Sequence, residues 1–132
     1  MSELRCVVVT PERTEVDLTA TAVTVPLYDG EMGILKNHSP LVGRLGYGVL
    51  RIKGAAGAAP SYFIEGGFVQ VVNNVVSVLT DRVVPRAEIT KAVADQAMQA
   101  AVDLPNATPE QVVLRDKACA RARAMQRISA AS

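Results

Sequence analysis

The stretch that decides the fold is DGEMGILKNHSPL, residues Asp29–Leu41, which lies between two apolar segments. Asp29 and Gly30 predict a tight turn, because glycine accepts positive φ angles without a Cβ clash. Gly33 predicts a bulge or a close backbone approach inside the strand that follows. A second corner is expected over residues 37–40, where Pro40 holds the preceding residue extended. A loop specified this closely favours presentation to a partner.

The segments around this stretch read as short strands up to about Val84. They are rich in β-branched residues, and Gly, Pro or Asn separates them. Asn73 and Asn74 predict a two-residue hairpin turn of the primed kind. Several strands are apolar on both faces, which indicates buried central strands or a sheet face that something else covers. We therefore expect an antiparallel sandwich or flattened barrel. The expected strands are 4–10, 14–18, 20–25, 48–53, 62–64, 68–72 and 75–80, with a small-residue hairpin loop at 54–60.

After Pro85 the apolar period becomes helical. A first helix is expected to bury a stripe that runs from Ile89 to Leu104. A second helix begins at Thr108 as N-cap, with Pro109 at the first helical position and Gln111 completing a capping box, and it runs to about residue 128. The short connection predicts an antiparallel helical hairpin. Its predicted stripes are Ile89, Ala92, Val93, Ala97, Ala100, Ala101 and Leu104 on the first helix, and Leu114, Ala118, Ala122 and Met125 on the second. Because alanine buries little area, the hairpin should be marginally stable and mobile.

The composition limits the classes of function that this chain can have. The chain has 132 residues and a net charge of +1, so global attraction to nucleic acid or to anionic lipid is not expected. Cys6 and Cys119 are expected to be free thiols in a reducing compartment, although a bridge stays open. No apolar run is long enough to span a bilayer, and the start resembles no signal peptide. We expect a cytoplasmic protein of two domains, 1–84 and 85–132.

The residue types do not assemble a catalytic or metal site. His38 is the only histidine, and neither further metal ligands nor a nucleophile accompany it. Gly43, Gly46 and Gly48 have the wrong spacing for a phosphate-binding loop and enter a strand instead of a helix. We therefore expect no catalytic residue, no metal and no cofactor, and we expect an interaction protein.

Two segments taken together, and in this order, carry a specific resemblance. The Asp29–Leu41 run is followed by GGFVQV at residues 66–71, and further matches lie at 8–13, 23–26, 48–52 and 74–81. Residues 4–84 resemble, motif by motif, the epsilon subunit of the bacterial F-type ATP synthase, which is called delta in mitochondria. The remainder matches in architecture only, and GYG at residues 46–48 departs from the family's turn.

This resemblance implies an α+β fold: a ten-stranded antiparallel β-sandwich followed by a helical hairpin. It implies a non-catalytic central-stalk subunit that turns with the rotor, couples proton flow to ATP synthesis and restrains ATP hydrolysis through its C-terminal helices. The implied partners are the gamma subunit, the c-subunit ring and, when the hairpin is extended, the alpha/beta catalytic head. The implied location is peripheral, on the cytoplasmic face of the bacterial membrane.

The resemblance also assigns roles to residues. Glu31 and Met32 are expected to meet the c ring, and Thr10 and the His38 corner to meet gamma. A basic face of the second helix is expected to meet acidic loops of the catalytic head. That face comprises Arg115, Arg121, Arg123 and Arg127, together with Lys117.

Two alternatives concern the helices. Some relatives bind ATP through an Asp and an Arg of the first helix, where this chain has Thr90 and Val93. A hydroxyl and an isopropyl group cannot replace those hydrogen bonds, so we predict no tight ATP binding. The competing function is an unrelated β-sandwich adaptor that binds an acidic protein partner through the basic helix.

Overall fold

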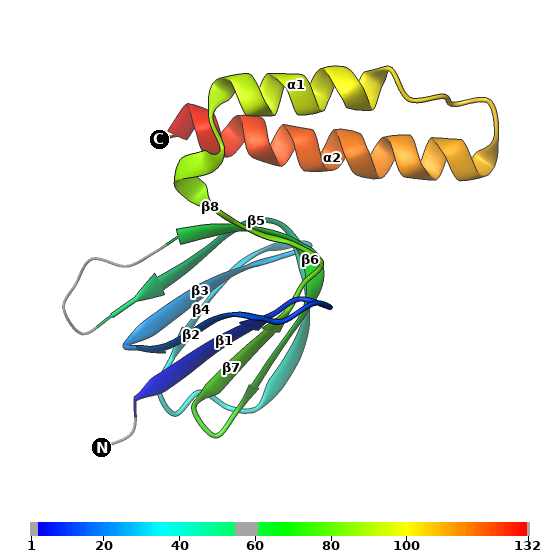
Figure 1. Cartoon of the computed structure of the whole chain (residues 1–132). Coiled ribbons are helices and arrows are strands. Elements are labelled where there is room, and N and C mark those ends of the chain that lie inside the picture. Colours follow the sequence, from blue (N-terminus) through cyan, green and yellow to red (C-terminus); the bar gives the residue numbers. More distant parts are fainter. Residues whose placement is uncertain (1–2, 55–60, 132) are drawn as a thin grey trace. The chain divides into compact units, whose positions relative to one another are not determined.

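The computed structural model describes residues 3–54 and 61–131 (Figure 1). The backbone forms two compact units, residues 1–85 and 86–132, and each is described by itself. The first is a β-sandwich and the second is a helical hairpin. The predicted hairpin loop at 54–60 lies, apart from Gly54, outside the described residues.

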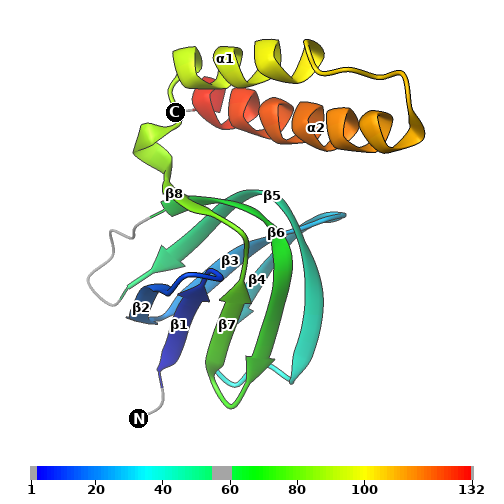
Figure 2. The same ribbon diagram turned by 45° about the vertical axis from the view of Figure 1, so that its right-hand side comes forward.

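Within the described residues, eight strands build the sandwich (Figures 1 and 2). They are β1 (Leu4–Val9), β2 (Thr14–Ala20), β3 (Ala22–Leu27), β4 (Gly30–Leu35), β5 (Leu41–Lys53), β6 (Ser61–Val72), β7 (Val75–Leu79) and β8 (Val83–Pro85). Neighbours follow the order β2-β1-β7-β6-β5-β3-β4, and β8 pairs with β6. Inward-facing side chains alternate along the strands and meet in one core, in which Leu4, Ile34, Leu50 and Ile64 are fully buried.

The predicted count of ten strands is wrong, and the reason is the length of β5 and β6. Residues 41–45 of β5 pair with the C-terminal half of β6, and that half of β6 also pairs with β7. Residues 47–51 of β5 pair with the N-terminal half of β6, which also pairs with β8, and the end of β5 pairs with β3. Both strands therefore pass through both layers of the sandwich. Counting each half separately would give the expected ten. The expected strands break β6 at its glycines and begin β5 seven residues too late.

The prediction of a wholly antiparallel sandwich also needs correction, because β1 and β7 are parallel, with Arg5 opposite Val75 and Val9 opposite Leu79. These strands are about 70 residues apart in sequence, so no turn signal between neighbours could reveal their pairing. The predicted turn between β6 and β7 is confirmed, since Asn73 and Asn74 both adopt positive φ angles (51° and 64°).

Glycines shape the point where β6 bends between the layers. Gly66 and Gly67 have φ angles of +71° and +104°, which side chains rarely adopt. A Cβ on Gly67 would also lie 1.8 Å from the carbonyl oxygen of Leu79. By contrast, nothing lies within 4 Å of a Cβ built on Gly33, which pairs in regular register with Thr24. The predicted bulge or close approach at Gly33 is therefore wrong.

The helical unit contains a 3-10 turn, η1 (Arg86–Glu88), and the helices α1 (Lys91–Val102) and α2 (Pro109–Ala131). The predicted capping box is confirmed. The backbone N–H of Gln111 donates to Thr108 Oγ1, and the backbone N–H of Thr108 donates to Gln111 Oε1, each at 3.2 Å. Thr90 caps α1 in the same manner by accepting from the N–H of Val93 at 3.2 Å. The described side chains that are buried in the two helices are Ala94, Ala101, Cys119, Ala122, Ala124, Met125 and Ile128.

The predicted apolar stripes are partly wrong. Leu114 is 63% exposed, and Val93 and Leu104 are also exposed. For Leu104 and Leu114 the reason is the difference in length between the helices: α1 ends at Val102, whose carbonyl oxygen accepts from Arg115 Nη2 at 3.3 Å. The first turns of α2 therefore extend beyond the end of α1. Farther along, Gln126 Nε2 donates to Asp95 Oδ1 at 3.3 Å and fixes the pairing of the helices.

Candidate functional site

One layer of the sandwich presents an outer face that is largely apolar. This layer holds β2, β1, β7, the C-terminal half of β6 and the start of β5. Because side chains alternate along a strand, the pairing registers define which residues share the outer face. The term outer face is used below for the residues on the solvent side of this layer. Its three rows are Val9–Leu79–Phe68–Arg44, then Val7–Ser77–Gln70–Val42, then Arg5–Val75–Val72.

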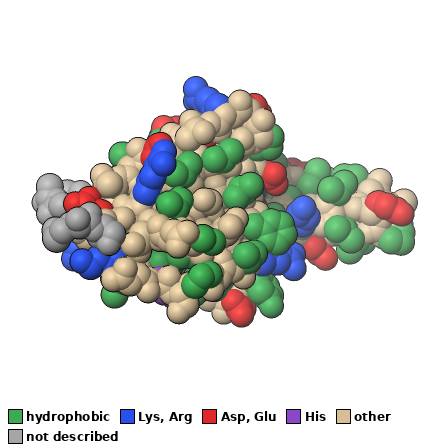
Figure 3. Space-filling model, turned by 90° about the horizontal axis from the view of Figure 1, so that it is seen from below, with side chains coloured by type: hydrophobic (Ala, Val, Ile, Leu, Met, Phe, Trp, Pro, Cys, Tyr) green, Lys and Arg blue, Asp and Glu red, His purple; other side chains and the backbone are tan. Residues whose placement is uncertain are grey.

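The apolar members of the outer face are unusually accessible. Val42 is 74% exposed, Phe68 58% and Leu79 50%, and the four valines beside them are half-buried. Figure 3 shows the molecule from below, where apolar side chains are scattered among polar and charged groups at the surface. A contiguous exposed apolar patch on a small protein marks an interaction site.

An aromatic–cation pair borders this face. The Arg44 guanidinium carbon lies 5.3 Å from the centroid of the Tyr28 ring, within cation–π range. The N–H of Tyr28 donates to the Arg44 carbonyl at 3.1 Å, which holds the β3–β4 turn against β5. Tyr28 itself is 66% exposed. Tyr and Arg are among the residue types most enriched in the energetic centres of protein interfaces.

The acidic residues along β2 are already paired within the chain. Arg5 binds Asp17 with two hydrogen bonds of 2.9 and 2.7 Å, and these lower the pKa of the Asp17 carboxyl. Arg13 Nε donates to Glu15 at 2.9 Å, and this hydrogen bond lowers the pKa of Glu15. The negative charge of this edge is therefore locally balanced.

Thr10 and His38, both expected at the gamma contact, lie at opposite ends of the outer face. Thr10 follows Val9 at one end of β1, and it is buried, with its Oγ1 donating to the Arg13 carbonyl and to Glu15 at 3.2 Å each. The His38 corner lies at the other end, because the N–H of Asn37 donates to Asn74 Oδ1 in the β6–β7 turn. His38 is half-buried, and its Nδ1 lies 2.7 Å from the Ser39 carbonyl oxygen.

Glu31 and Met32, expected at the c ring, differ in accessibility. Glu31 is exposed and pairs with Arg51 across the sheet at 3.0 Å. Met32 is half-buried and packs against the core, so it is not an apolar residue at the turn tip. At the turn of this hairpin, the exposed residues are Tyr28–Glu31.

The structure divides the basic residues of α2. Arg115 is half-buried and caps the last turn of α1, as described above. Arg121 is half-buried and has an interaction within the chain. Arg123 and Arg127 are exposed, as is Lys117. Among the basic residues of α2, only these last three are exposed.

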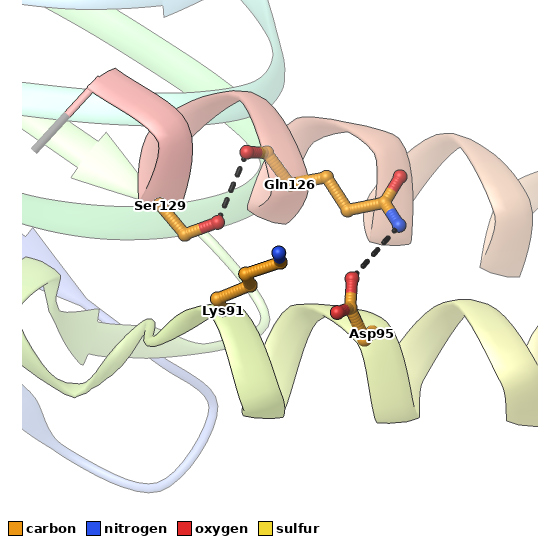
Figure 4. Close-up of a pocket in the computed structure, with 4 residues that line it drawn as sticks. All are labelled: Lys91, Asp95, Gln126 and Ser129. Atoms are coloured by element: carbon orange, nitrogen blue, oxygen red, sulfur yellow. Dashed lines mark hydrogen bonds between the residues drawn. The ribbon is translucent and has the colours of Figure 1, made fainter.

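A shallow cavity of about 310 Å³ lies between the two helices, lined by Lys91, Asp95, Gln126 and Ser129 (Figure 4). The amide of Gln126 already binds Asp95, and the Ser129 hydroxyl donates to the Gln126 carbonyl at 3.0 Å. Within residues 3–54 and 61–131, no three His, Cys, Asp or Glu side chains cluster closely enough to hold a metal. Over the same residues, neither helix is long and apolar enough to cross a bilayer.

Sequence reasoning missed the most exposed candidates. Phe68 and Leu79 lie in expected strands that are apolar on both sides, so the sequence does not distinguish them from core residues, and Val42 precedes the strand expected at 48–53. That double-sided pattern was itself the signal, since a strand at the surface of a two-layer sandwich needs only one apolar face. Tyr28 was missed because the turn that holds it was assigned to Asp29 and Gly30.

The chain thus combines a β-sandwich that exposes an apolar sheet face with a C-terminal helical hairpin. Residues 3–86 match the family described as "ATP synthase, Delta/Epsilon chain, beta-sandwich domain". The chain is 47% identical over 126 residues to the ATP synthase epsilon chain of Rhodopirellula baltica, covering 96% of this chain and 98% of the relative. It belongs to the ATP synthase delta/epsilon family.

Other relatives agree with this assignment. The ATP synthase epsilon chain of Symbiobacterium thermophilum is 48% identical over 82 residues, covering 61% of this chain and 58% of that protein. The fold matches a chain in the Euglena gracilis mitochondrial ATP synthase structure (OSCP/F1/c-ring) with a TM-score of 0.84 at 22% identity, over 96% of this chain and 81% of that one. A chain of the Tetrahymena thermophila central stalk and c-ring structure gives 0.75 at 15% identity, over 97% of each chain.

Proposed function

We propose that this chain is the non-catalytic rotor subunit of the central stalk of an F-type ATP synthase. It would couple proton flow to ATP synthesis while it is bound to gamma and resting on the c ring, at the cytoplasmic face of the bacterial membrane. The observation that carries the proposal is the exposed outer face, on a sandwich whose family membership is established. Burial of this face by a permanent partner accounts for its apolar character.

Gamma is the proposed occupant of the outer face. Thr10 and the His38 corner bound this face at its two ends, which supports their assignment to the gamma contact. Because Thr10 is buried and bonded internally, its proposed role is to shape the border instead of meeting gamma directly. The exposed anchors would be Phe68, Leu79 and Val42.

The test is the affinity of the full chain for the gamma subunit of the same enzyme. Replacing Phe68 with Ser should weaken binding by about 2 kcal/mol, or roughly 30-fold, as expected for a central aromatic anchor. Val113→Ser is the matched control, since Val113 is 59% exposed on α2 and Phe68 is 58% exposed. Equal affinity of the two variants would contradict this assignment.

We place the c-ring contact at the β3–β4 hairpin. Glu31 supplies an exposed carboxylate there, and Tyr28 adds an exposed aromatic ring. Met32 would support the turn from the core side. In cross-linking of the assembled enzyme, a cysteine at Glu31 should react with the ring and a cysteine at Lys117 should not.

The hairpin is the proposed regulatory element. Its alanine-rich buried seam is consistent with an element that opens at low cost. Arg123 and Arg127 are the exposed cations available to acidic loops of the catalytic head. Deleting residues 86–132 should raise ATP hydrolysis while leaving assembly intact, and unchanged hydrolysis would count against inhibition.

A further inference from the structure

The outer face carries two arginines, Arg5 and Arg44, and only Arg5 forms an ion pair within the part of the chain that the structure describes. Arg5 and Asp17 neutralise one another at the β1–β2 edge, as do Arg13 and Glu15 beside them. Arg44, in the row of Phe68 and Leu79, forms no ion pair with any residue in 3–54 or 61–131. The Arg44 guanidinium lies over the face of the Tyr28 ring.

The surroundings of Arg44 are those of an interface anchor. Phe68 stands directly opposite it on β6, and Leu79 stands opposite Phe68 on β7. The Tyr28 ring restricts the guanidinium, so less side-chain entropy is lost when a partner binds. Guanidinium is weakly hydrated and tolerates desolvation better than the ammonium of Lys. A cation held in this way suits a contact that becomes buried.

We propose that Arg44 determines partner specificity on this face by receiving a carboxylate that lies among apolar side chains of the partner. The proposal rests on the proposed function, because it takes the gamma-type stalk subunit as the occupant. Burying Arg44 unpaired would be strongly unfavourable, so an occupant that covers Phe68 and Leu79 must supply an acceptor beside them. A planar guanidinium binds a carboxylate through two parallel hydrogen bonds, which fixes orientation as well as sign.

The experiment measures binding of the purified full chain to the purified gamma subunit at two salt concentrations. Arg44→Gln removes the charge, and Arg44→Glu reverses it. Lys53→Gln is the matched control, because Lys53 is an exposed cation of the same strand but in the other layer. Arg44 is exposed, so its variants should fold, and their tyrosine fluorescence in unfolding experiments checks this.

We expect Arg44→Gln to weaken binding at least about tenfold and Arg44→Glu to weaken it further, with Lys53→Gln changing it less than about twofold. Replacing single Asp or Glu residues of gamma by Lys should identify one position that restores binding of Arg44→Glu. Normal binding of Arg44→Gln, with Phe68→Ser still impaired, would overturn the carboxylate contact and leave the proposed function standing. Normal binding of both Arg44→Gln and Phe68→Ser would overturn the carboxylate contact and the proposed gamma contact alike.

Discussion

The bend of β6 offers the sharpest test of how this sandwich is held together. At Gly67 a Cβ would lie 1.8 Å from the Leu79 carbonyl oxygen and 2.9 Å from the Thr80 Cα, on a backbone with φ of +104°. The positive φ alone costs about 1–3 kcal/mol for a residue other than glycine. Separating the two strands until the Cβ fits adds about 1–3 kcal/mol. We therefore expect Gly67→Ala to lower the free energy of unfolding of the sandwich by about 4 kcal/mol.

Two other glycines of the same sandwich separate these contributions. Gly66 has a φ of +71° but open space around a Cβ, so Gly66→Ala should cost only about 1–2 kcal/mol. Gly33 has neither constraint, and Gly33→Ala should be neutral or stabilise by up to about 1 kcal/mol. The series thus isolates the clash with the Leu79 carbonyl from the backbone strain.

The assay is urea unfolding followed by tyrosine fluorescence. The chain contains three tyrosines and no tryptophan, and Tyr28, Tyr47 and Tyr62 all lie in the sandwich. With a denaturant slope of about 1.5 kcal/mol per molar, Gly67→Ala should lower the midpoint by about 2–3 M. A Gly67→Ala variant within about 1 kcal/mol of Gly33→Ala would refute the close approach of β6 and β7.

Three further predictions address caps, charge and exposure. Thr108→Ala should destabilise the hairpin by about 1 kcal/mol, because the Gln111 N–H loses its acceptor, whereas Thr108→Ser should not; thermal loss of helical circular dichroism distinguishes them. The pKa values of the Glu15 and Asp17 carboxyls are lower in the folded state, so their contribution to stability is complete above the unfolded values near 4 and is lost as pH falls through the folded values. The double variant Glu15→Gln, Asp17→Asn should therefore lose less stability as the solution is acidified. If its stability falls with pH as steeply as that of the unchanged chain, the two ion pairs are contradicted. Cys6 is completely buried, and burial raises the pKa of its thiol to about 12, whereas Cys119 lies in the alanine-rich hairpin. A thiol reagent should therefore modify Cys119 first, as followed by mass spectrometry. Equal rates of modification would mean that the two units open together.

Local signals predicted the local elements well. The Asn73–Asn74 turn and the Thr108–Gln111 capping box depend on residues close in sequence, and both are confirmed. Non-local pairing had no such signal. The parallel contact of β1 with β7 and the passage of β5 and β6 through both layers depend on register between distant segments.

The candidate site was harder to predict than the fold, for a physical reason. Apolar residues drive folding and partner binding by the same effect, so Phe68 and Leu79 could not be told from core residues until their exposure was known. Likewise, the basic spacing of α2 does not show that Arg115 is engaged at the end of α1 while Arg123 and Arg127 stay exposed.

The most direct test of the rotor role is ATP-driven proton pumping by membrane vesicles from cells that lack this chain. Adding back the full chain should restore pumping, and Phe68→Ser should restore it only at about 30-fold higher concentration, in line with its weaker binding. The account would be contradicted if pumping is the same with and without the added chain. It would also be contradicted if the unchanged chain and Phe68→Ser restore pumping equally at limiting concentration.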